Sequence, residues 1–323
     1  MNDGHEARLE PRLGLIAATA VALGAIIGAG VFVALGQAAV TTGGSLPLAI
    51  LLGAIVATFN GLSAAELGVA YPRAGGAYEF GYRAVSPLVG FLAGWIFVLA
   101  GITASATYTL TFAGYLQPLF PDLPLRPIGI ALVLAAVAAN ALGVRLSARV
   151  NNVLVGFKIA VLIVFVVVGL RGFALRNLTP FFAGGIGGLL QAGALLFFAF
   201  SGYARPVTIV EEIKEPDRTL PRAVIGALSS SLLLYLAVAV VALGLVGPQV
   251  LGQTLAPLRD AGAAAQIAWL PALVSLGALV ATTSVLLTEF WGLSRLTFAM
   301  ARRGDLPMFL GRLSEGGRVP RLA

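Results

Sequence analysis

Few side chains in this sequence are of a type that does chemistry. The 323 residues contain no cysteine and a single histidine, His5, which lies in a polar N-terminal stretch. Disulfides and thiolate metal sites are therefore excluded, and histidine-based metal or acid–base chemistry would rest on one residue. The apolar segments also contain no pair of carboxylates near their centres. We expect no metal site, no cofactor and no enzymatic activity.

The most informative ionisable side chain is Lys158, which stands inside the apolar segment 151–170. A charge at the centre of a bilayer costs several kcal/mol on insertion scales. Only two of the 21 basic residues are lysines, yet the basic residue in this segment is a lysine, which can release its proton where arginine cannot. Lys158 is therefore a candidate proton carrier. The alternative is a lysine that extends its ammonium group to the nearer membrane surface.

Backbone groups form a second candidate for chemistry. The stretch "GAIIGAGVF" (24–32) has Gly24, Gly28 and Gly30 inside an apolar segment, although glycine weakens a helix by about 1 kcal/mol relative to alanine. If residues 27–30 unwind, free N–H groups at the start of the next half-helix suit a carboxylate. Free carbonyls at the end of the preceding half-helix suit an ammonium group. The alternative is close helix packing, for which small residues four apart are typical.

A second interruption follows in the sixth apolar segment. The stretch "FFAFSGYARP" (197–206) contains a small pair, Ser201 and Gly202, followed by Pro206. Interrupted hydrophobic segments at corresponding positions of two halves are typical of secondary transporters with an inverted repeat and a substrate site at the membrane midplane.

The elements that must position these groups are membrane-spanning helices. With 59% hydrophobic and 11% charged residues, the chain lies far from the usual soluble composition of about 25% charged residues. Runs such as "KIAVLIVFVVVGL" (158–170) are apolar on every side, which favours helices over a β-barrel. The sequence predicts an all-α transmembrane protein with eight spans, at about 13–38, 46–70, 86–116, 127–143, 151–170, 187–209, 221–246 and 267–294.

The net charge of +7 does not indicate nucleic-acid binding, because the basic residues gather on alternate loops. With the N-terminus in the cytoplasm, the outer loops hold only Arg126, Arg171, Arg176 and Arg259. This is the positive-inside pattern of a multi-pass protein. We expect the plasma (inner) membrane, a cytoplasmic N-terminal tail at 1–12, a membrane transport domain at 13–294 and a cytoplasmic segment at 295–323. The oligomeric state stays open.

Four stretches carry a family resemblance. They are "GAIIGAGVF", "AAELGVAYPRAGGAYEFGYRAVSPLVGFLAGW" (64–95), "FSGYARPVTIVEEIKEPDRTLPRAV" (200–224) and "LSRLTFAMARRGDLPMFL" (293–310). The chain resembles the amino acid permease branch of the amino acid–polyamine–organocation (APC) superfamily. The resemblance implies a five-plus-five inverted-repeat fold of the leucine-transporter type, with helices 1 and 6 broken around the substrate. The second repeat would be incomplete, because the chain stops after the eighth span, before an expected ninth.

The resemblance also implies roles for particular residues. The substrate carboxylate would meet N–H groups of Gly28, Ala29 and Gly30, and the ammonium would meet carbonyls near Ile26, Phe198 and Ser201. Phe198 and Tyr203 hold positions in the motif that could wall a side-chain pocket, and Gly202 belongs to the second interruption. Some proton-coupled relatives carry a lysine where Lys158 stands.

One departure from the family pattern bears on the substrate. An acidic residue often follows the aromatic residue of the sixth-span motif, but here Tyr203 is followed by Ala204 and Arg205. This favours neutral over cationic amino acids. We expect a secondary transporter of amino acids that works by proton-coupled alternating access. The alternatives are a sodium-coupled amino acid carrier and a non-transporting membrane sensor or scaffold derived from a permease.

Overall fold

The computed structural model describes residues 10–141 and 144–311. Within these residues every regular element is helical, apart from one isolated parallel bridge between Leu13 and Ile213. The predicted all-α transmembrane class is confirmed. The helices are α1 (Leu15–Ile26), α2 (Leu35–Thr42), α3 (Leu46–Ala70), α4 (Ala77–Phe80), α5 (Pro87–Leu116), α6 (Leu125–Ala141), α7 (Val144–Gly169), α8 (Gly185–Phe200), α9 (Ala204–Thr208), α10 (Pro216–Leu251), α11 (Pro257–Ala264) and α12 (Leu270–Arg303).

Six stretches of the described chain are long and apolar enough to cross a membrane. The first, Leu15–Ala70, is 56 residues long and contains both expected spans 13–38 and 46–70. The expected span 127–143 corresponds to the shorter helix α6. The last helix continues to Arg303, beyond the expected end at 294. Parts of three predicted segments lie outside the described residues, namely 1–9, 142–143 and 312–323.

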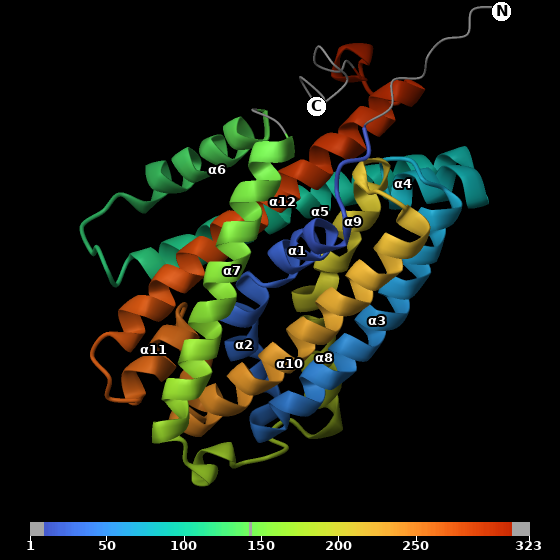
Figure 1. Cartoon of the computed structure of the whole chain (residues 1–323). Coiled ribbons are helices and arrows are strands. Elements are labelled where there is room, and N and C mark those ends of the chain that lie inside the picture. Colours follow the sequence, from blue (N-terminus) through green and yellow to red (C-terminus); the bar gives the residue numbers. More distant parts are fainter. Residues whose placement is uncertain (1–9, 142–143, 312–323) are drawn as a thin grey trace, which may run out of the picture.

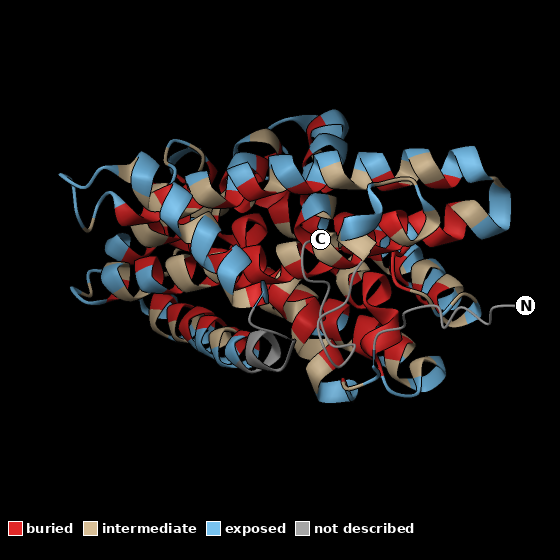
Figure 2. Ribbon diagram, turned by 90° about the horizontal axis from the view of Figure 1, so that it is seen from above, coloured by how far each residue is buried: buried red, intermediate tan, exposed pale blue. Residues whose placement is uncertain are grey.

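The first span lies in the interior of the bundle. Helix α1 packs against α7, α10 and α12, and Figure 1 shows it enclosed by these longer helices. Buried residues gather on the inner faces of the helices and exposed ones on the outer faces, as Figure 2 shows. Many exposed side chains are large and apolar, Ile96, Leu134 and Val167 among them. An apolar outer surface around a buried interior suits a protein that is surrounded by lipid.

The first span is broken where the glycine-rich stretch predicts. Helix α1 ends at Ile26, and Ile27 takes an extended conformation with φ −78° and ψ 94°. The chain then resumes as a π-helical turn, Gly30–Ala34, that leads into α2. An extended residue between two helical segments removes hydrogen bonds from the helical ladder, so the backbone groups on either side need other partners.

The sixth span is interrupted differently. Helix α8 ends at Phe200 and is followed by a 3₁₀ turn, Ser201–Tyr203, and the short helix α9. Ser201 keeps helical dihedral angles, with φ −61° and ψ −11°. The helix therefore tightens into a 3₁₀ turn at Ser201 and Gly202. The expected interruption is present, but the backbone there is not unwound. The Ser201 hydroxyl donates to Phe198 O at 2.8 Å, which satisfies a carbonyl that an unwound segment would leave free.

Candidate substrate and coupling site

The two interruptions are in direct contact, and the glycines make this contact possible. A Cβ atom on Gly202 would lie 2.4 Å from the backbone nitrogen of Ile26. A Cβ atom on Gly30 would lie 2.5 Å from Cβ of Ala199. Both separations are too short for carbon, so the backbones of the first and sixth spans could not approach so closely with larger residues.

The start of the second half-helix presents N–H groups at the break. Val31 N and Phe32 N both donate to Gly28 O at 3.2 Å, which makes Gly28 O the first acceptor after the break. The N–H groups of Ala29 and Gly30 precede this first helical bond. They lie at the positive end of the helix dipole, where an anionic group is stabilised.

The carbonyl groups on the other side of the break are held by two side chains. The ammonium group of Lys158 donates to Gly24 O at 2.8 Å and to Ile27 O at 2.6 Å. The hydroxyl of Tyr235 in α10 donates to Ile26 O at 2.8 Å. The carbonyls that the break releases are therefore bonded to an ammonium and a phenol inside the protein.

Lys158 is fully buried and its ammonium has three acceptors. The third is the hydroxyl of Ser284 in α12, at 3.2 Å, so the count matches the three donors of a protonated lysine. The side chain therefore does not extend to the membrane surface, which was the alternative interpretation. It lies between the broken first span and α12.

The network around Lys158 continues through Asn151, two helical turns earlier on the same face of α7. Ser284 Oγ donates to Asn151 Oδ1 at 3.0 Å, and Asn151 Nδ2 donates to Ala20 O at 3.0 Å. These bonds connect α1, α7 and α12 through polar groups inside an apolar bundle. Because buried polar groups are costly when unpaired, the network favours this one arrangement of the three helices.

A second buried polar cluster lies between α9 and α12. Arg205 forms an ion pair with Glu289, and its guanidinium lies 5.1 Å from the ring centroid of Phe97. Within the described chain, Arg205 Nη1 and Glu289 Oε1 have no hydrogen-bond partner. The ion pair neutralises a carboxylate that is only 1% exposed. In residues 10–141 and 144–311, no group of three or more histidine, aspartate or glutamate side chains could hold a metal ion.

The predicted substrate residues fall into two groups. Ile26, Gly30 and Gly202 meet at the contact between the spans, and Gly28 and Ala29 are buried next to them. The side chains of Phe198 and Tyr203 are not brought to this contact. Phe198 is 39% exposed on the outer side of α8, and Tyr203 is buried against Gly61 of α3. Ser201 bonds back to its own helix.

Sequence reasoning missed Asn151 and Tyr235. Asn151 precedes Lys158 by seven residues, which is two helical turns and places both side chains on one face of α7. This spacing could have identified it. Tyr235 is the only tyrosine in the apolar segment 221–246, but nothing in the local pattern indicates that its hydroxyl reaches the first span.

Comparisons with known proteins identify the family of this chain. The model of the amino acid permease family matches residues 18–323. An uncharacterized transporter of Mycobacterium tuberculosis is 38% identical over 314 residues, which cover 97% of this chain and 70% of that protein. The branched-chain amino acid permease of Bacillus subtilis is 30% identical, and the matched part covers 98% of this chain and 73% of that permease. The methylthioribose transporter of Bacillus subtilis is 29% identical, and the matched part covers 94% of this chain and 69% of that transporter.

Proposed function

This chain belongs to the amino acid permease family, and from that premise we propose that it is a secondary transporter that moves neutral amino acids together with protons by alternating access. It is a multi-pass membrane protein of a transporter family and not an enzyme. Family membership leaves the substrate open, because related proteins are named for different substrates. It leaves three finer properties to be proposed. These are how the amino acid is held, what carries the proton and which side chains are accepted.

The amino acid is held by backbone groups. Its carboxylate binds the N–H groups of Gly28, Ala29 and Gly30, which precede Val31, the first N–H donor to Gly28 O in the second half-helix. Its ammonium group binds carbonyls near Ile26, Phe198 and Ser201, where the first and sixth spans meet. Ionised side chains are not needed for this, since opposite ends of two half-helices carry opposite partial charges.

Binding requires the two interrupted spans to separate. Two of these carbonyls already accept hydroxyl groups, Ile26 O from Tyr235 and Phe198 O from Ser201, each at 2.8 Å. A carbonyl oxygen has two lone pairs, so Ile26 O can accept a second donor. Phe198 O also accepts from the backbone N–H of Ser201, so it has to release one of its two donors before it binds an ammonium group. The close contact of Gly202 with Ile26 has to open before an amino acid fits between the spans. The packed arrangement is therefore one state of the cycle, and a separated arrangement is the other.

Lys158 carries the proton, and the observation that carries this proposal is its pair of bonds to Gly24 O and Ile27 O. In the protonated state its ammonium holds both carbonyls and so favours the extended conformation of Ile27. That conformation sets the N–H groups of Ala29 and Gly30 at the start of a new half-helix. Proton binding and substrate binding then stabilise the same backbone geometry, which is the linkage that symport requires.

Neutral substrates are supported by the charge around the break. Tyr203 is followed by Ala204 and Arg205, and Arg205 is paired with the buried carboxylate of Glu289. The carboxylate of this cluster is therefore already neutralised by Arg205, so a cationic side chain of a substrate would gain little from it. An uncharged side chain avoids that cost.

The transporter spans the plasma membrane with its N-terminus in the cytoplasm. The eight helical spans expected at 13–294 form the transport domain, and the loops with most of the arginines face inward. This orientation is supported by the positive-inside pattern.

The test of the coupling proposal is uptake of radiolabelled leucine and alanine by proteoliposomes that contain the full chain. With an inward proton gradient we expect accumulation, and with Lys158→Gln we expect uptake to fall to the level of protein-free liposomes. The matched control is Lys214→Gln, which changes the only other lysine, an exposed one. Thermal unfolding of each variant in detergent checks that it is folded.

Three outcomes would contradict the proposal. Full gradient-driven uptake by Lys158→Gln would show that another group carries the proton. Loss of wild-type uptake when choline replaces external sodium would favour the sodium-coupled carrier. Amino acid binding without uptake would favour the sensor.

A further inference from the structure

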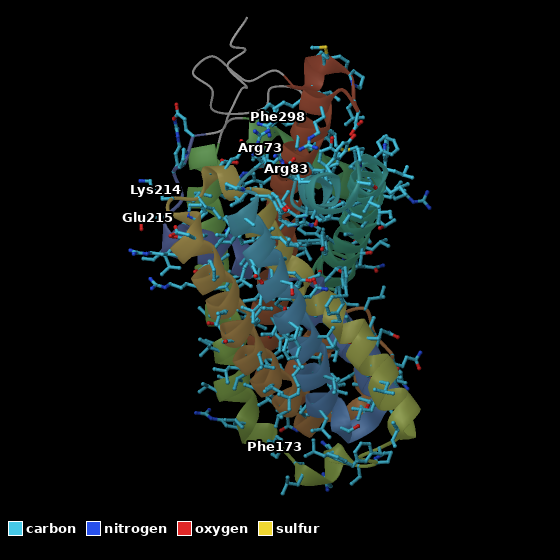
Figure 3. All side chains as sticks on the ribbon, turned by 90° about the vertical axis from the view of Figure 1, so that its right-hand side faces the viewer. Arg73, Arg83, Phe173, Lys214, Glu215 and Phe298 are labelled. Carbon is cyan, nitrogen blue, oxygen red and sulfur yellow. The ribbon has the colours of Figure 1, made fainter. Side chains whose placement is uncertain are left out.

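A pocket lined mainly by arginines lies at one end of the bundle, away from the proposed substrate site. It has a volume of about 330 Å³ and is lined by Arg73, Glu79, Arg83, Arg302 and Arg303. A smaller pocket of about 130 Å³ shares Arg73 and Arg83 with it. Figure 3 shows Arg73 and Arg83 at the same end as Phe298 of α12, and opposite to Phe173. We call this end the arginine-rich end.

Three separate segments supply the arginines. Arg73 follows α3, Arg83 lies in the π-helical turn Gly81–Val85, and Arg302 and Arg303 form the last turn of α12. The pocket therefore exists only in the folded protein. Anything bound there touches the ends of the second and eighth spans and the segment that leads into the third.

Cations outnumber carboxylates in the lining. Glu79 is the one carboxylate among four guanidinium groups, and it pairs with both Arg83 and Arg303. Behind the pocket, Glu211 accepts from Arg302 Nη2 and from Ala74 N, each at 2.9 Å. Asp305 accepts from the hydroxyls of Tyr78 and Tyr82 at 2.6 and 3.1 Å. The lining and these neighbours together hold four guanidinium groups and three carboxylates.

Aromatic rings hold two of the guanidinium groups in place. Arg303 lies over the ring of Tyr82, 4.4 Å from its centroid, and Arg302 lies 5.0 Å from the centroid of Phe298. A guanidinium stacked on a ring keeps its N–H groups at the edge, where they can donate to an oxyanion. Little side-chain ordering is then required when an anion binds, which favours affinity.

We propose that this pocket binds a phosphate-bearing anion. Planar guanidinium groups match the oxygens of a phosphate with paired N–H donors, and several arginines around one site are typical of phosphate recognition. A phosphate bridging Arg73 and Arg83 to the end of α12 also ties these segments together, so occupancy raises the thermal stability of the bundle.

Two sources can supply this phosphate, a lipid headgroup or a soluble phosphate. The lipid source has an additional argument. Val85 is 70% exposed and Leu88 is 66% exposed, and both follow Arg83 closely in the chain. A headgroup in the pocket could therefore have its acyl chains against an apolar surface, as for anionic lipids bound by basic pockets between membrane helices.

The test is thermal unfolding of the full-length chain in a neutral detergent, followed by tryptophan fluorescence. The probes are inorganic phosphate, chloride at the same ionic strength, short-chain phosphatidylglycerol and short-chain phosphatidylcholine. We expect the midpoint temperature to rise by several degrees with a phosphate-bearing anion, more than with chloride. A rise with phosphatidylglycerol alone identifies a lipid headgroup, and a rise with inorganic phosphate as well identifies a site open to soluble anions.

The variants show whether the effect belongs to this pocket. Arg73→Gln combined with Arg83→Gln removes two lining cations and leaves Arg303 on Glu79, and we expect it to abolish the rise. Arg218→Gln is the matched control, because Arg218 is exposed at the start of α10 and does not line the pocket. If the double variant does not fold, Arg73→Gln alone is expected to reduce the rise and Arg83→Lys to retain part of it.

The proposal is overturned if chloride or phosphatidylcholine stabilises the protein as much as the phosphate probes do. It is also overturned if the arginine variants respond like the wild type, or if Arg218→Gln loses the response to the same extent. None of these readings depends on transport, so the site can fail while the proposed function stands.

Discussion

At the scale of single residues, this protein buries ionised groups in an apolar interior and stabilises them in two different ways. Among the residues that the structure describes, the partners of Lys158 are carbonyl and hydroxyl oxygens and not a carboxylate. Arg205 and Glu289 stabilise each other, but each keeps one atom without a partner in the described chain. The first arrangement fits the proposed proton transfer, because carbonyl and hydroxyl oxygens carry no charge that loss of the proton would leave unpaired. The second keeps both charges but leaves part of their desolvation cost uncompensated.

The ion pair of Arg205 and Glu289 can be tested by a double-mutant cycle. Removing one partner leaves a buried, uncompensated charge, and this typically costs about 3–5 kcal/mol. We expect Arg205→Gln and Glu289→Gln each to lower thermal stability in detergent strongly. The double variant should be more stable than either single variant, because neither charge remains. Additive losses in the double variant would show that the two side chains are not energetically coupled.

At the scale of helices, the first and sixth spans form one unit. The break at Ile27 and the 3₁₀ turn at Ser201–Tyr203 lie against each other. Glycine serves here to permit contact, since neither Gly30 nor Gly202 has a positive φ angle. The packing interpretation and the broken-helix interpretation of the glycines therefore both apply, because the breaks can meet only where side chains are absent.

Gly202→Ala tests this contact. The added Cβ would lie 2.4 Å from Ile26 N, so the two spans have to move apart, and we expect lower thermal stability by about 1–3 kcal/mol, as for an overpacked core. Uptake of amino acids should fall as well. The matched control is Gly187→Ala in α8, where no atom lies within 4 Å of the added Cβ. Equal behaviour of the two variants would contradict a close contact at Gly202.

At the scale of the whole molecule, polar connections concentrate at the arginine-rich end. Glu212 accepts from Arg295 Nε at 2.7 Å and from Trp291 Nε1 at 3.2 Å. Its backbone carbonyl accepts from Arg12 N and Leu13 N, both at 2.8 Å. This one residue, at the end of the 3₁₀ turn Val210–Glu212, therefore connects the start of the first span with the eighth span. Buried ion pairs and hydrogen bonds connect the helices at this end, and these have to break if substrate leaves there.

Cysteine labelling tests the proposed orientation of the molecule. The chain has no cysteine, so a single introduced one reports its own position. Glu215 is exposed near the arginine-rich end and Arg176 is exposed in the connection between α7 and α8. With a membrane-impermeant maleimide on intact cells, we expect Arg176→Cys to react and Glu215→Cys to react only after permeabilisation. The reverse pattern would mean that the arginine-rich end faces outward.

Much of this protein follows from local sequence. Hydropathy determines the all-α transmembrane class, since a backbone in lipid must satisfy its own hydrogen bonds. Glycine spacing locates the break in the first span, and the rarity of lysine singles out Lys158 before any partner is known. The i, i+7 spacing of Asn151 and Lys158 would also have placed both on one face of α7.

Other features depend on tertiary structure. Ser284 lies 126 residues from Lys158, and Tyr235 lies 209 residues from Ile26. No local pattern specifies which helix faces meet over such separations, because an apolar helix can pack against many others. The same holds for the pairing of Arg205 with Glu289, for the tightening of the sixth span, and for the four arginines that three distant segments bring into one pocket. Sequence determined which groups had to be satisfied inside the membrane, and helix packing decided which partners satisfy them.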